Sequence, residues 1–322
     1  MKVVSLKEMK KIEKLSSGIF SFDLLTRGGI PIGKYTLIYG DKSTGKSTFS
    51  LRVCKSFLRK YPDRKILWID FENSFDVEWA KRIIGYDTEN LLIAQPDFAE
   101  DGIDILQENL QSPDVGLYII DSLAMIVPQT EANADAEQSF IGQLARTVNS
   151  LLRKTIPYAQ KHNNEGNPIT FLLLNQLRNK IGQPSYMPQY SLPAGKFQEF
   201  LASIAVRFYQ GKIDKDNEKI PTKIEYEFVI EKNKVGGIPK VVGSYTMALV
   251  NQGFYKAGDV MDENSIYKFA EQYGFITKTQ KGYTLYGNSY KTQKELMYEL
   301  YKNEDLKRKL ISEIIEKYYS EE

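Results

Sequence analysis

The stretch Gly40-Asp41-Lys42-Ser43-Thr44-Gly45-Lys46-Ser47 decides the fold, because it has the complete G-x-x-x-x-G-K-[ST] spacing of a phosphate-binding loop. The largely apolar segment 34–39 precedes it and has the composition of a strand. Segment 48–60 follows it with apolar residues at the spacing of one helix face. A strand, a glycine-rich turn and a helix N-terminus form a cradle of backbone N–H groups for phosphates. We therefore predict that the chain binds ATP or GTP; the flanking segments argue against the alternative, a chance match in an ordinary turn.

The residue types in this loop fit the chemistry of a nucleotide. Gly40 and Gly45 allow backbone conformations that a side chain would obstruct. The ammonium group of Lys46 can reach the β and γ phosphates, and the hydroxyl of Ser47 can complete a Mg²⁺ shell. The residues predicted to contact the nucleotide are Gly40, Asp41, Lys42, Ser43, Thr44, Gly45, Lys46, Ser47 and Thr48.

Length and composition restrict the class of protein. The chain has 322 residues, 42% of them hydrophobic, which is enough for a large α/β core with or without a smaller second domain. Its net charge of +2 gives no general attraction for nucleic acid, so any such binding must come from local patches. No uninterrupted apolar stretch of about 18 residues occurs, and segment 1–14 is too charged for a secretory signal. We therefore expect a soluble, cytoplasmic protein.

One cysteine and one histidine leave little room for several other site chemistries. Cys54 alone forms neither an intrachain disulfide nor a cysteine-based metal site, and its place in a predicted helix favours a small buried residue over a reactive thiol. His162 lies in a polar stretch that we interpret as an exposed loop. Nothing in the sequence pairs it with a nucleophile, so a Ser-His-Asp triad has no support.

Short apolar segments alternate with helical ones after the phosphate loop. Segments 65–70, 116–121 and 169–175 have the pattern of buried strands, separated by predicted helices over 77–84, 102–110 and about 138–160. This alternation predicts an α/β fold with a mostly parallel central sheet flanked by helices. Ligands of such sheets bind at the carboxyl ends of the strands, where this chain has polar residues. We expect those side chains to converge around the phosphates.

The pattern changes in the last third of the chain. Segments 223–231 and 241–250 are expected to be antiparallel strands, and the chain beyond Gly258 a small α/β segment that ends in one charged helix over about 292–319. We predict a short N-terminal segment over 1–33, which can dock on another subunit, a core domain over 34–256 and a small C-terminal α/β domain over 257–322.

Polar residues at three strand ends are candidates for catalysis. Asp121 ends a hydrophobic strand and can hold Mg²⁺ through water, although a helix-capping role is the alternative. Glu72 follows the strand 65–70 and can orient and deprotonate an attacking water; alternatively it is a solvated loop acid. Gln176 follows the third strand and can contact a γ-phosphate through its side-chain amide.

Two regions suggest a second, polyanionic ligand. Segment 177–186 mixes basic, apolar and aromatic residues, including Arg178, Lys180 and Ile181. Arg146 and Arg153 are seven residues apart, which places them on one face of the long predicted helix. Basic groups can follow a phosphate backbone while apolar residues insert between bases. From spacing alone, a solvated basic face explains these residues equally well.

Taken together, the ordered motifs resemble the RecA family of DNA strand-exchange recombinases, over about residues 15–285. Besides the phosphate loop, the resemblance rests on segments 15–23, 28–33, 69–72, 95–97, 119–122, 175–182 and 232–234. It implies a RecA-type P-loop NTPase core, ATP and Mg²⁺ as cofactors, single- and double-stranded DNA as partners, and self-assembly into a helical filament with ATP at the subunit interfaces.

The resemblance also implies roles for individual residues. Glu72 would be the catalytic glutamate, and Gln176 the residue that couples the γ-phosphate to a DNA-binding loop. Asp76 and Trp79 match positions that hold the adenine. Lys232 and Lys234 match paired lysines that reach ATP bound to the neighbouring subunit. The following residues are implied to contact DNA: Ile141 and Ile181 as apolar wedges in two loops over 131–139 and 177–193 or beside them, Arg146 and Arg153 on the DNA backbone, and Arg178 and Lys180 on phosphates.

Several departures from the family pattern stand out. The chain before Leu15 is short, a pair of glycines is replaced by Ala194-Gly195, and Glu199 stands where the family has a lysine. These features resemble a phage or mobile-element recombinase. We expect an ATP-dependent recombinase; the alternatives are an ATP-binding paralogue or filament regulator without strand exchange, and a hexameric helicase motor, against which the Lys232–Lys234 pair argues.

Overall fold

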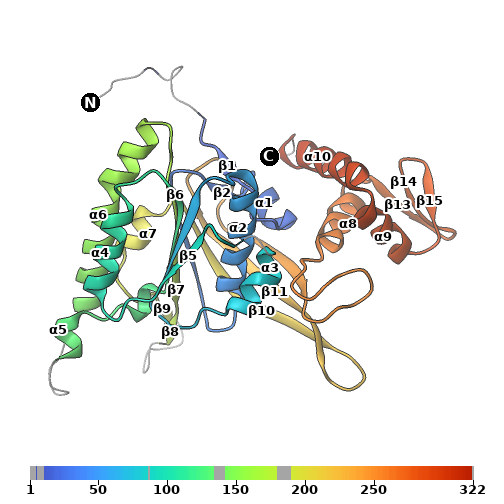
Figure 1. Ribbon diagram of the computed structural model, residues 1–322. Helices are drawn as coiled ribbons and strands as arrows, with labels where there is room; N and C mark the ends of the chain where they lie inside the picture. Colours follow the sequence, from blue (N-terminus) through green and yellow to red (C-terminus); the bar gives the residue numbers. More distant parts are fainter. Residues whose placement is uncertain (1–4, 6–10, 86–87, 134–141, 180–189, 321–322) are drawn as a thin grey trace. The chain divides into compact units, whose positions relative to one another are not determined.

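The structure is a computed structural model that describes residues 5, 11–85, 88–133, 142–179 and 190–320 (Figure 1). The chain divides into two compact units. The first contains residues 1–18, 25–209 and 228–242, and the second contains residues 19–24, 210–227 and 243–322.

Helices and strands alternate through the first two thirds of the chain. In order they are β1 Lys14–Leu15, α1 Phe20–Leu25, β2 Ile30–Pro31, β3 Tyr35–Gly40, α2 Lys46–Lys60, β4 Lys65–Asp70, α3 Val77–Ile84, β5 Leu91–Ala94, α4 Ala99–Asn109, β6 Val115–Asp121, the 3-10 helix η2 Leu123–Met125, α5 Gln129–Ala132, α6 Gln143–Asn164, β7 Thr170–Gln176, β8 Arg178–Asn179, β9 Tyr190–Ser191 and α7 Phe197–Leu201. The remaining elements are β10 Ile204–Lys215, β11 Pro221–Asn233, β12 Val241–Ala248, α8 Asp262–Gln272, β13 Ile276–Thr279, β14 Gly282–Leu285, β15 Asn288–Tyr290, α9 Gln293–Lys302 and α10 Glu304–Ser320.

The central sheet has eight strands in the order β12-β11-β10-β3-β7-β6-β4-β5. The pairs β10–β3, β3–β7, β7–β6, β6–β4 and β4–β5 are all parallel. The predicted α/β fold with a mostly parallel sheet is therefore confirmed. The register pairs Gly40 with Gln176 and Asp70 with Asp121, so these strand ends lie at one edge of the sheet.

Helices cover both faces of the parallel part of the sheet. In Figure 1, α4 and α6 lie on one face and α2 and α3 on the other. The α4–α6 face packs a continuous apolar core in which the ring of Phe171 stacks on Tyr35 and Tyr118, with centroids 4.6 and 5.1 Å away. Cys54 is fully buried on α2, as its predicted role as a small core residue requires, and burial raises the pKa of its thiol.

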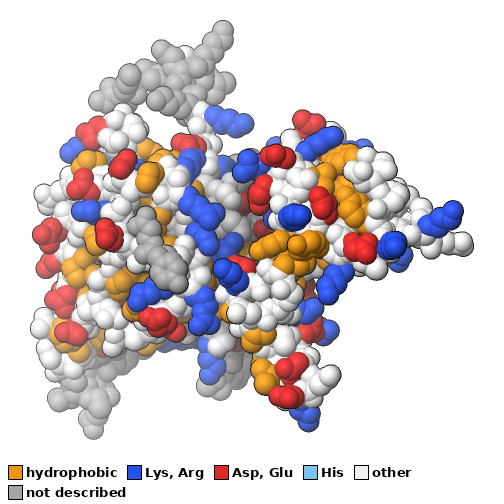
Figure 2. All heavy atoms as spheres, turned by 45° about the vertical axis from the view of Figure 1, so that its right-hand side comes forward, with side chains coloured by type: hydrophobic (Ala, Val, Ile, Leu, Met, Phe, Trp, Pro, Cys, Tyr) orange, Lys and Arg blue, Asp and Glu red, His pale blue; other side chains and the backbone are white. Residues whose placement is uncertain are grey.

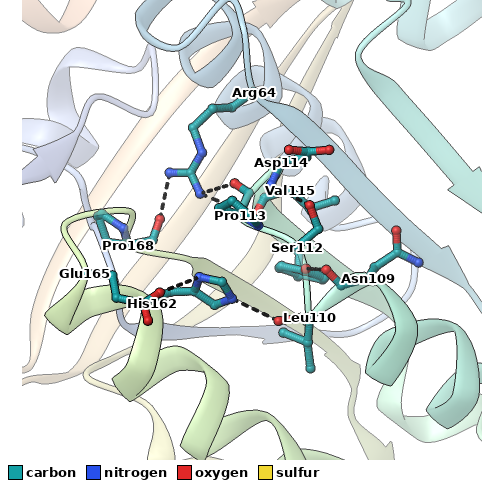
Figure 3. A network of polar contacts seen from close by, with 11 residues as sticks. Arg64, Asn109, Leu110, Ser112, Pro113, Asp114, Val115, His162, Glu165 and Pro168 are labelled. Atoms are coloured by element: carbon teal, nitrogen blue, oxygen red, sulfur yellow. Dashed lines mark hydrogen bonds and ion pairs between the residues drawn. The ribbon is translucent and has the colours of Figure 1, made fainter.

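His162 does not lie in an exposed loop as the sequence analysis expects; it is buried on α6. The helix continues to Asn164, and His162 shares its apolar face with Thr155 and Ala159 at the three- and four-residue spacing of a helix. Figure 3 shows its ring reaching the chain after α4, where Nε2 donates a hydrogen bond to the carbonyl of Leu110 at 2.9 Å. Its role is therefore structural.

Arg64 holds the loops beside this histidine (Figure 3). Its guanidinium donates to the carbonyl oxygens of Pro168 at 2.8 Å, Pro113 at 3.2 Å and Val115 at 3.3 Å. Burial lowers the pKa of this guanidinium, while neighbouring tyrosines and Asp114 act in the opposite direction. A rigid fork of donors suits three converging carbonyl groups. The network ties together the chain before β6 and the chain before β7.

The second unit has its own core. Helices α8, α9 and α10 pack with the antiparallel sheet β13-β14-β15 around buried residues such as Leu296, Leu300, Leu310 and Ile314. The single helix predicted over 292–319 is wrong, because the chain breaks at Asn303. The side-chain oxygen of Asn303 accepts a hydrogen bond from the N–H of Leu306 at 3.1 Å, which starts α10 as a new helix. Within the described ranges, no helix is long and apolar enough to cross a membrane.

Candidate nucleotide-binding and catalytic site

The phosphate loop connects β3 to α2 with the geometry that its glycines permit. Gly45 has a φ of 84°, and a Cβ at Gly40 would lie 2.4 Å from the carbonyl oxygen of Phe208 on β10. Both positions therefore require glycine. The Lys46 ammonium donates to the carbonyl of Asp41 at 2.6 Å and to that of Gly40 at 3.3 Å. This holds the lysine along the loop, where its charge can meet a phosphate. Burial lowers its pKa, while nearby carboxylates led by Asp121 act to raise it.

Ser47 and Asp121 form the candidate magnesium site. The hydroxyl of Ser47 donates to Oδ2 of Asp121 at 3.0 Å, which brings the phosphate loop and the end of β6 together. Burial, followed by the negative charge of Glu72, raises the pKa of Asp121 to about 7. A hydroxyl and a carboxylate fit Mg²⁺, a hard cation that takes oxygen ligands and retains several waters. The alternative role of Asp121 as a helix cap has no support here, since the η2 helix lacks a side-chain cap.

Glu72 and Gln176 meet across the strand ends. Nε2 of Gln176 donates to Oε1 of Glu72 at 2.5 Å, so the candidate base is paired with the candidate γ-phosphate contact. Glu72 is half-buried rather than fully solvated. A carboxylate held by one amide retains lone pairs for a water molecule. The strand ends thus bring the candidate base, the candidate metal ligand and the phosphate loop together.

Asp70 positions the turn that carries Glu72, a role that the sequence analysis missed. Its buried carboxylate accepts hydrogen bonds from the backbone N–H groups of Glu72, Ser74 and Phe75 at 3.1, 2.9 and 2.9 Å. Gln95 also donates to it, at 3.2 Å. An aspartate at the end of a buried strand, followed by Asn and Ser, is the sequence signal for such a turn.

Of the two residues assigned to the adenine, Trp79 contacts the start of α2, and Asp76 begins the helix that carries Trp79. The carboxylate of Asp76 caps α3 by accepting from the N–H of Trp79 at 2.9 Å. The indole N–H of Trp79 donates to the hydroxyl of Thr48 at 3.1 Å. This contact fixes the half-buried indole against the first turn of α2, and the second assigned residue, Asp76, stays exposed.

Lys232 and Lys234, at the end of β11, lie near the start of β3, whereas the phosphate loop follows the end of β3. The backbone N–H of Lys234 donates to Ser203, and the N–H of Ser203 donates to Tyr35, the first residue of β3. Gly40 ends the same strand, roughly 16 Å away at about 3.3 Å per residue. The Lys232 ammonium donates to the carbonyls of Glu199 and Phe200. Burial lowers the pKa of Lys232, and the positive charge of Lys234 adds to that effect. Both lysines therefore lie too far along the sheet to reach the phosphate loop of their own chain.

The sequence of this chain is similar to those of known proteins. The family profile for the RecA N-terminal domain matches residues 1–247. The chain belongs to the RecA family. Protein RecA of Helicobacter acinonychis (strain Sheeba) is 33% identical over 258 residues, which cover 80% of this chain and 71% of that protein. Protein RecA of Helicobacter hepaticus is 32% identical over the same length, and that of Wolinella succinogenes 31%. The family resemblance seen in the motifs is thereby confirmed.

The described residues assigned to DNA lie on exposed surface of this RecA-family chain. Arg146 and Arg153 are both exposed on α6, opposite its buried face. Arg178 is exposed on β8, and its guanidinium donates to the carbonyl of Ala124 at 3.3 Å. Ile141, Lys180 and Ile181 lie outside the described residues. Figure 2 shows side chains of both charges on the visible face of the molecule.

Segment 177–193 starts at the phosphate loop. The N–H of Leu177 donates to the carbonyl of Gly40 at 3.2 Å, directly after Gln176. Arg178 pairs with Ser191, and Asn179 with Tyr190, in the short β8–β9 ladder. The first and last described parts of this segment are therefore joined. Asn175, to which the sequence analysis assigned no individual role, also takes part at this point through bonds to Pro193 and Gln198.

Proposed function

We propose that this RecA-family protein is an ATP-dependent recombinase that forms a helical filament on single-stranded DNA and catalyses homologous pairing and strand exchange with double-stranded DNA. The hydrogen bond between Glu72 and Gln176 carries the proposal. It joins the residue suited to activate water with the residue from which segment 177–193 begins. An ATPase whose rate depends on DNA needs such a connection. The proposed location of the protein is the cytoplasm.

ATP and Mg²⁺ are the proposed cofactors, because the residues present fit them. The phosphate loop supplies backbone N–H groups and the Lys46 ammonium for the phosphates. Ser47 and Asp121 would hold Mg²⁺, which would reduce the negative charge of the phosphates. Trp79 provides an aromatic face for the adenine, and Asp76 a polar contact.

Hydrolysis is assigned to Glu72 as the general base. Its carboxylate orients a water molecule and accepts its proton as the water attacks the γ-phosphorus. The bond from that phosphorus to the β–γ bridging oxygen breaks, and ADP leaves. The amide of Gln176 competes for the same carboxylate, and a γ-phosphate offers that amide another acceptor. When Gln176 turns to the phosphate, Glu72 is released for water. The conformation of the chain that follows Gln176 then depends on the bound nucleotide. In the same way, DNA bound to this part of the chain changes the rate of hydrolysis.

Lys232 and Lys234 are assigned to the ATP of a neighbouring subunit. Their place at the amino end of β3 prevents contact with the phosphates of their own chain. Cations supplied by a second subunit can stabilise the negative charge that develops during phosphoryl transfer. The active site is then complete only between two copies, so hydrolysis and filament assembly depend on each other.

The test is an ATPase assay with and without single-stranded DNA over a range of salt concentrations, combined with a strand-exchange assay. We expect slow hydrolysis alone and a clear increase with DNA that weakens as salt rises, because phosphate contacts are salt-dependent. Equal rates with and without DNA at every salt concentration would contradict the proposal. Filaments with DNA-stimulated hydrolysis but no pairing of homologous strands would indicate a filament regulator instead.

A further inference from the structure

Asn175 and Gln198 form a pair of amides inside the protein, and both side chains are fully buried. Nδ2 of Asn175 donates to Oε1 of Gln198 at 2.7 Å and to the carbonyl of Pro193 at 3.1 Å. Nε2 of Gln198 donates to Pro193 at 2.5 Å and to Gly195 at 2.8 Å. All four side-chain N–H bonds therefore have an acceptor.

The same pair is connected to Gln176. Oδ1 of Asn175 accepts the backbone N–H of Gln176 at 2.8 Å. Asn175 thus holds Gln176, the residue directly before segment 177–193. Asn175 and Gln198 both hold Pro193, the last residue of that segment. Two bonds from Asn175 join these ends: one to Gln198 at 2.7 Å and one directly to the carbonyl of Pro193 at 3.1 Å.

The chain that Gln198 holds has an unfavourable backbone conformation. Ala194 has a φ of 67° and Gly195 a φ of 76°, so two successive residues are in the left-handed region. This region is unfavourable for a residue with a side chain. The bonds from Gln198 to the carbonyls on either side of Ala194 stabilise that turn.

An apolar side chain would fill the place of Gln198 without the cost of burying an amide. Burying polar groups is unfavourable unless all are hydrogen-bonded, and a fully bonded network fixes one geometry. The network around Asn175 and Gln198 meets that condition. The polar side chains of this network therefore fix the position of the Gln176 peptide relative to residues 190–195, which we call the stem of segment 177–193.

We propose that Gln198 is a positioning residue that transmits the nucleotide state of Gln176 to the stem of segment 177–193. This inference rests on the proposed function and adds the route, from Gln176 through Asn175 and Gln198 to residues 193–195, by which the nucleotide acts on the segment. When a γ-phosphate draws Gln176 away from Glu72, the Gln176 peptide moves Asn175. Asn175 acts on Pro193 directly and through Gln198, and Gln198 carries the movement on to Gly195. Gln198 itself does not touch the nucleotide.

Gln198→Met tests this route, because methionine has a similar volume and no hydrogen bonds to give. Hydrogen–deuterium exchange is measured for peptides covering residues 190–197, with and without Mg²⁺ and a non-hydrolysable ATP analogue. In the wild type, the analogue should change exchange in these peptides at least about fivefold, the effect of one net hydrogen bond. In Gln198→Met that difference should shrink to less than half, since only the direct bond from Asn175 to Pro193 remains, while the analogue still binds.

Thr155→Val is the matched control. Thr155 is buried, bonds to Tyr35 at 2.7 Å and belongs to α6 rather than to this network. Its loss should lower the melting temperature and leave the nucleotide-dependent exchange intact. Asn175→Leu breaks the bridge from its other side and replaces Gln198→Met if that variant does not fold.

Each outcome bears on the route. Retention of the nucleotide-dependent difference in a folded Gln198→Met or Asn175→Leu variant would overturn it, as would its absence from the wild type. A wild type that shows the difference but no DNA stimulation of its ATPase would refute the proposed function and leave the route standing. Ala194→Gly added to Gln198→Met should raise the melting temperature without restoring the difference; restoration would mean that Gln198 only stabilises the turn.

Discussion

The side chain of Gln176 donates a hydrogen bond to the carboxylate of Glu72, with 2.5 Å between Nε2 and Oε1. The two residues come from the ends of β7 and β4, which are separated in the sheet by β6. Asp121 at the end of that middle strand bonds to Ser47 of the phosphate loop. The three strand ends therefore connect the proposed base, the proposed metal site and the start of segment 177–193.

Glu72→Gln should retain nucleotide binding and lose most hydrolysis, by about a hundredfold or more, because an amide keeps the shape of the side chain but is a poor base. Steady-state ATPase rates and titration with a fluorescent nucleotide give the two quantities. Glu78→Gln is the matched control, since Glu78 is exposed on α3 and forms an ion pair with Lys81 in the same helix. Normal hydrolysis by Glu72→Gln would make Glu72 a loop acid without a catalytic role.

The pKa of Asp121 predicts a pH dependence of Mg²⁺ binding. Because burial raises this pKa to about 7, a proton competes with the metal at neutral pH. Apparent Mg²⁺ affinity in the presence of nucleotide should weaken as the pH falls from 8 to 6, by up to about tenfold per pH unit below the pKa. The titration is repeated with Asp121→Asn, which has no proton to lose and should show only the weaker dependence due to the nucleotide. An identical slope in both proteins would remove Asp121 from the metal site.

Much of this site follows from the sequence because its chemistry is local. The phosphate loop and the polar strand ends are short motifs, and parallel strands bring their carboxyl ends to one edge. The positions of Asn175 and Gln198 do not follow in this way, since their bond joins residues 23 positions apart through a turn at Ala194. A buried glutamine looks like any surface glutamine until its surroundings are known.

The errors in the sequence analysis have the same physical origin. His162 is surrounded in sequence by polar residues, but α6 directs its side chain towards Leu110, the residue that ends α4. The break at Asn303 depends on one side-chain bond that competes with continuous helix formation. The predicted domain boundaries remain a prediction.

Arg64 should contribute to the free energy of unfolding and not to nucleotide binding. Arg64→Met leaves three carbonyl groups without their donor, which should lower the free energy of unfolding by about 1–3 kcal/mol. Chemical denaturation measures this loss. Arg59→Met is the control, because Arg59 is exposed on α2 and should change stability by less than about 0.5 kcal/mol. A change in the Michaelis constant for ATP in Arg64→Met would contradict the separation of this network from the site.

Lys232→Ala and Lys234→Ala should each reduce ATPase activity and filament formation together. The decisive measurement mixes either variant with Lys46→Ala subunits. If the lysines act on a neighbour, some interfaces in the mixture combine an intact phosphate loop with intact lysines, and partial activity returns. If they act within one chain, every subunit lacks a necessary part and no mixture exceeds its parents. Absence of recovery in mixtures that are shown to co-assemble would refute the assignment to the neighbouring subunit.

Ile181 and Arg178 should separate strand exchange from DNA binding. Apolar wedges unstack bases at a cost of a few kcal/mol per opened step, which new protein contacts offset. Ile181→Ala should therefore keep ATP binding and most DNA affinity but impair strand exchange, and Ile141→Ala should act similarly. Arg178→Ala, and likewise Lys180→Ala, should weaken DNA binding and flatten its salt dependence. Ile220→Ala, at a half-exposed isoleucine outside these segments, is the matched control.

Thermal melting distinguishes a wedge from a core residue at position 181. If Ile181 packs inside the protein, its truncation leaves a cavity and lowers the melting temperature, with a cost of about 2–5 kcal/mol. If it contacts bases, the melting temperature in the absence of DNA stays unchanged while strand exchange is lost. The same comparison applied to Arg178→Ala should show weaker binding at low salt and convergence with the wild type at high salt, because the lost contact is to a phosphate. Unchanged strand exchange in a stable Ile181→Ala protein would leave the basic residues as the only DNA contacts proposed for this segment.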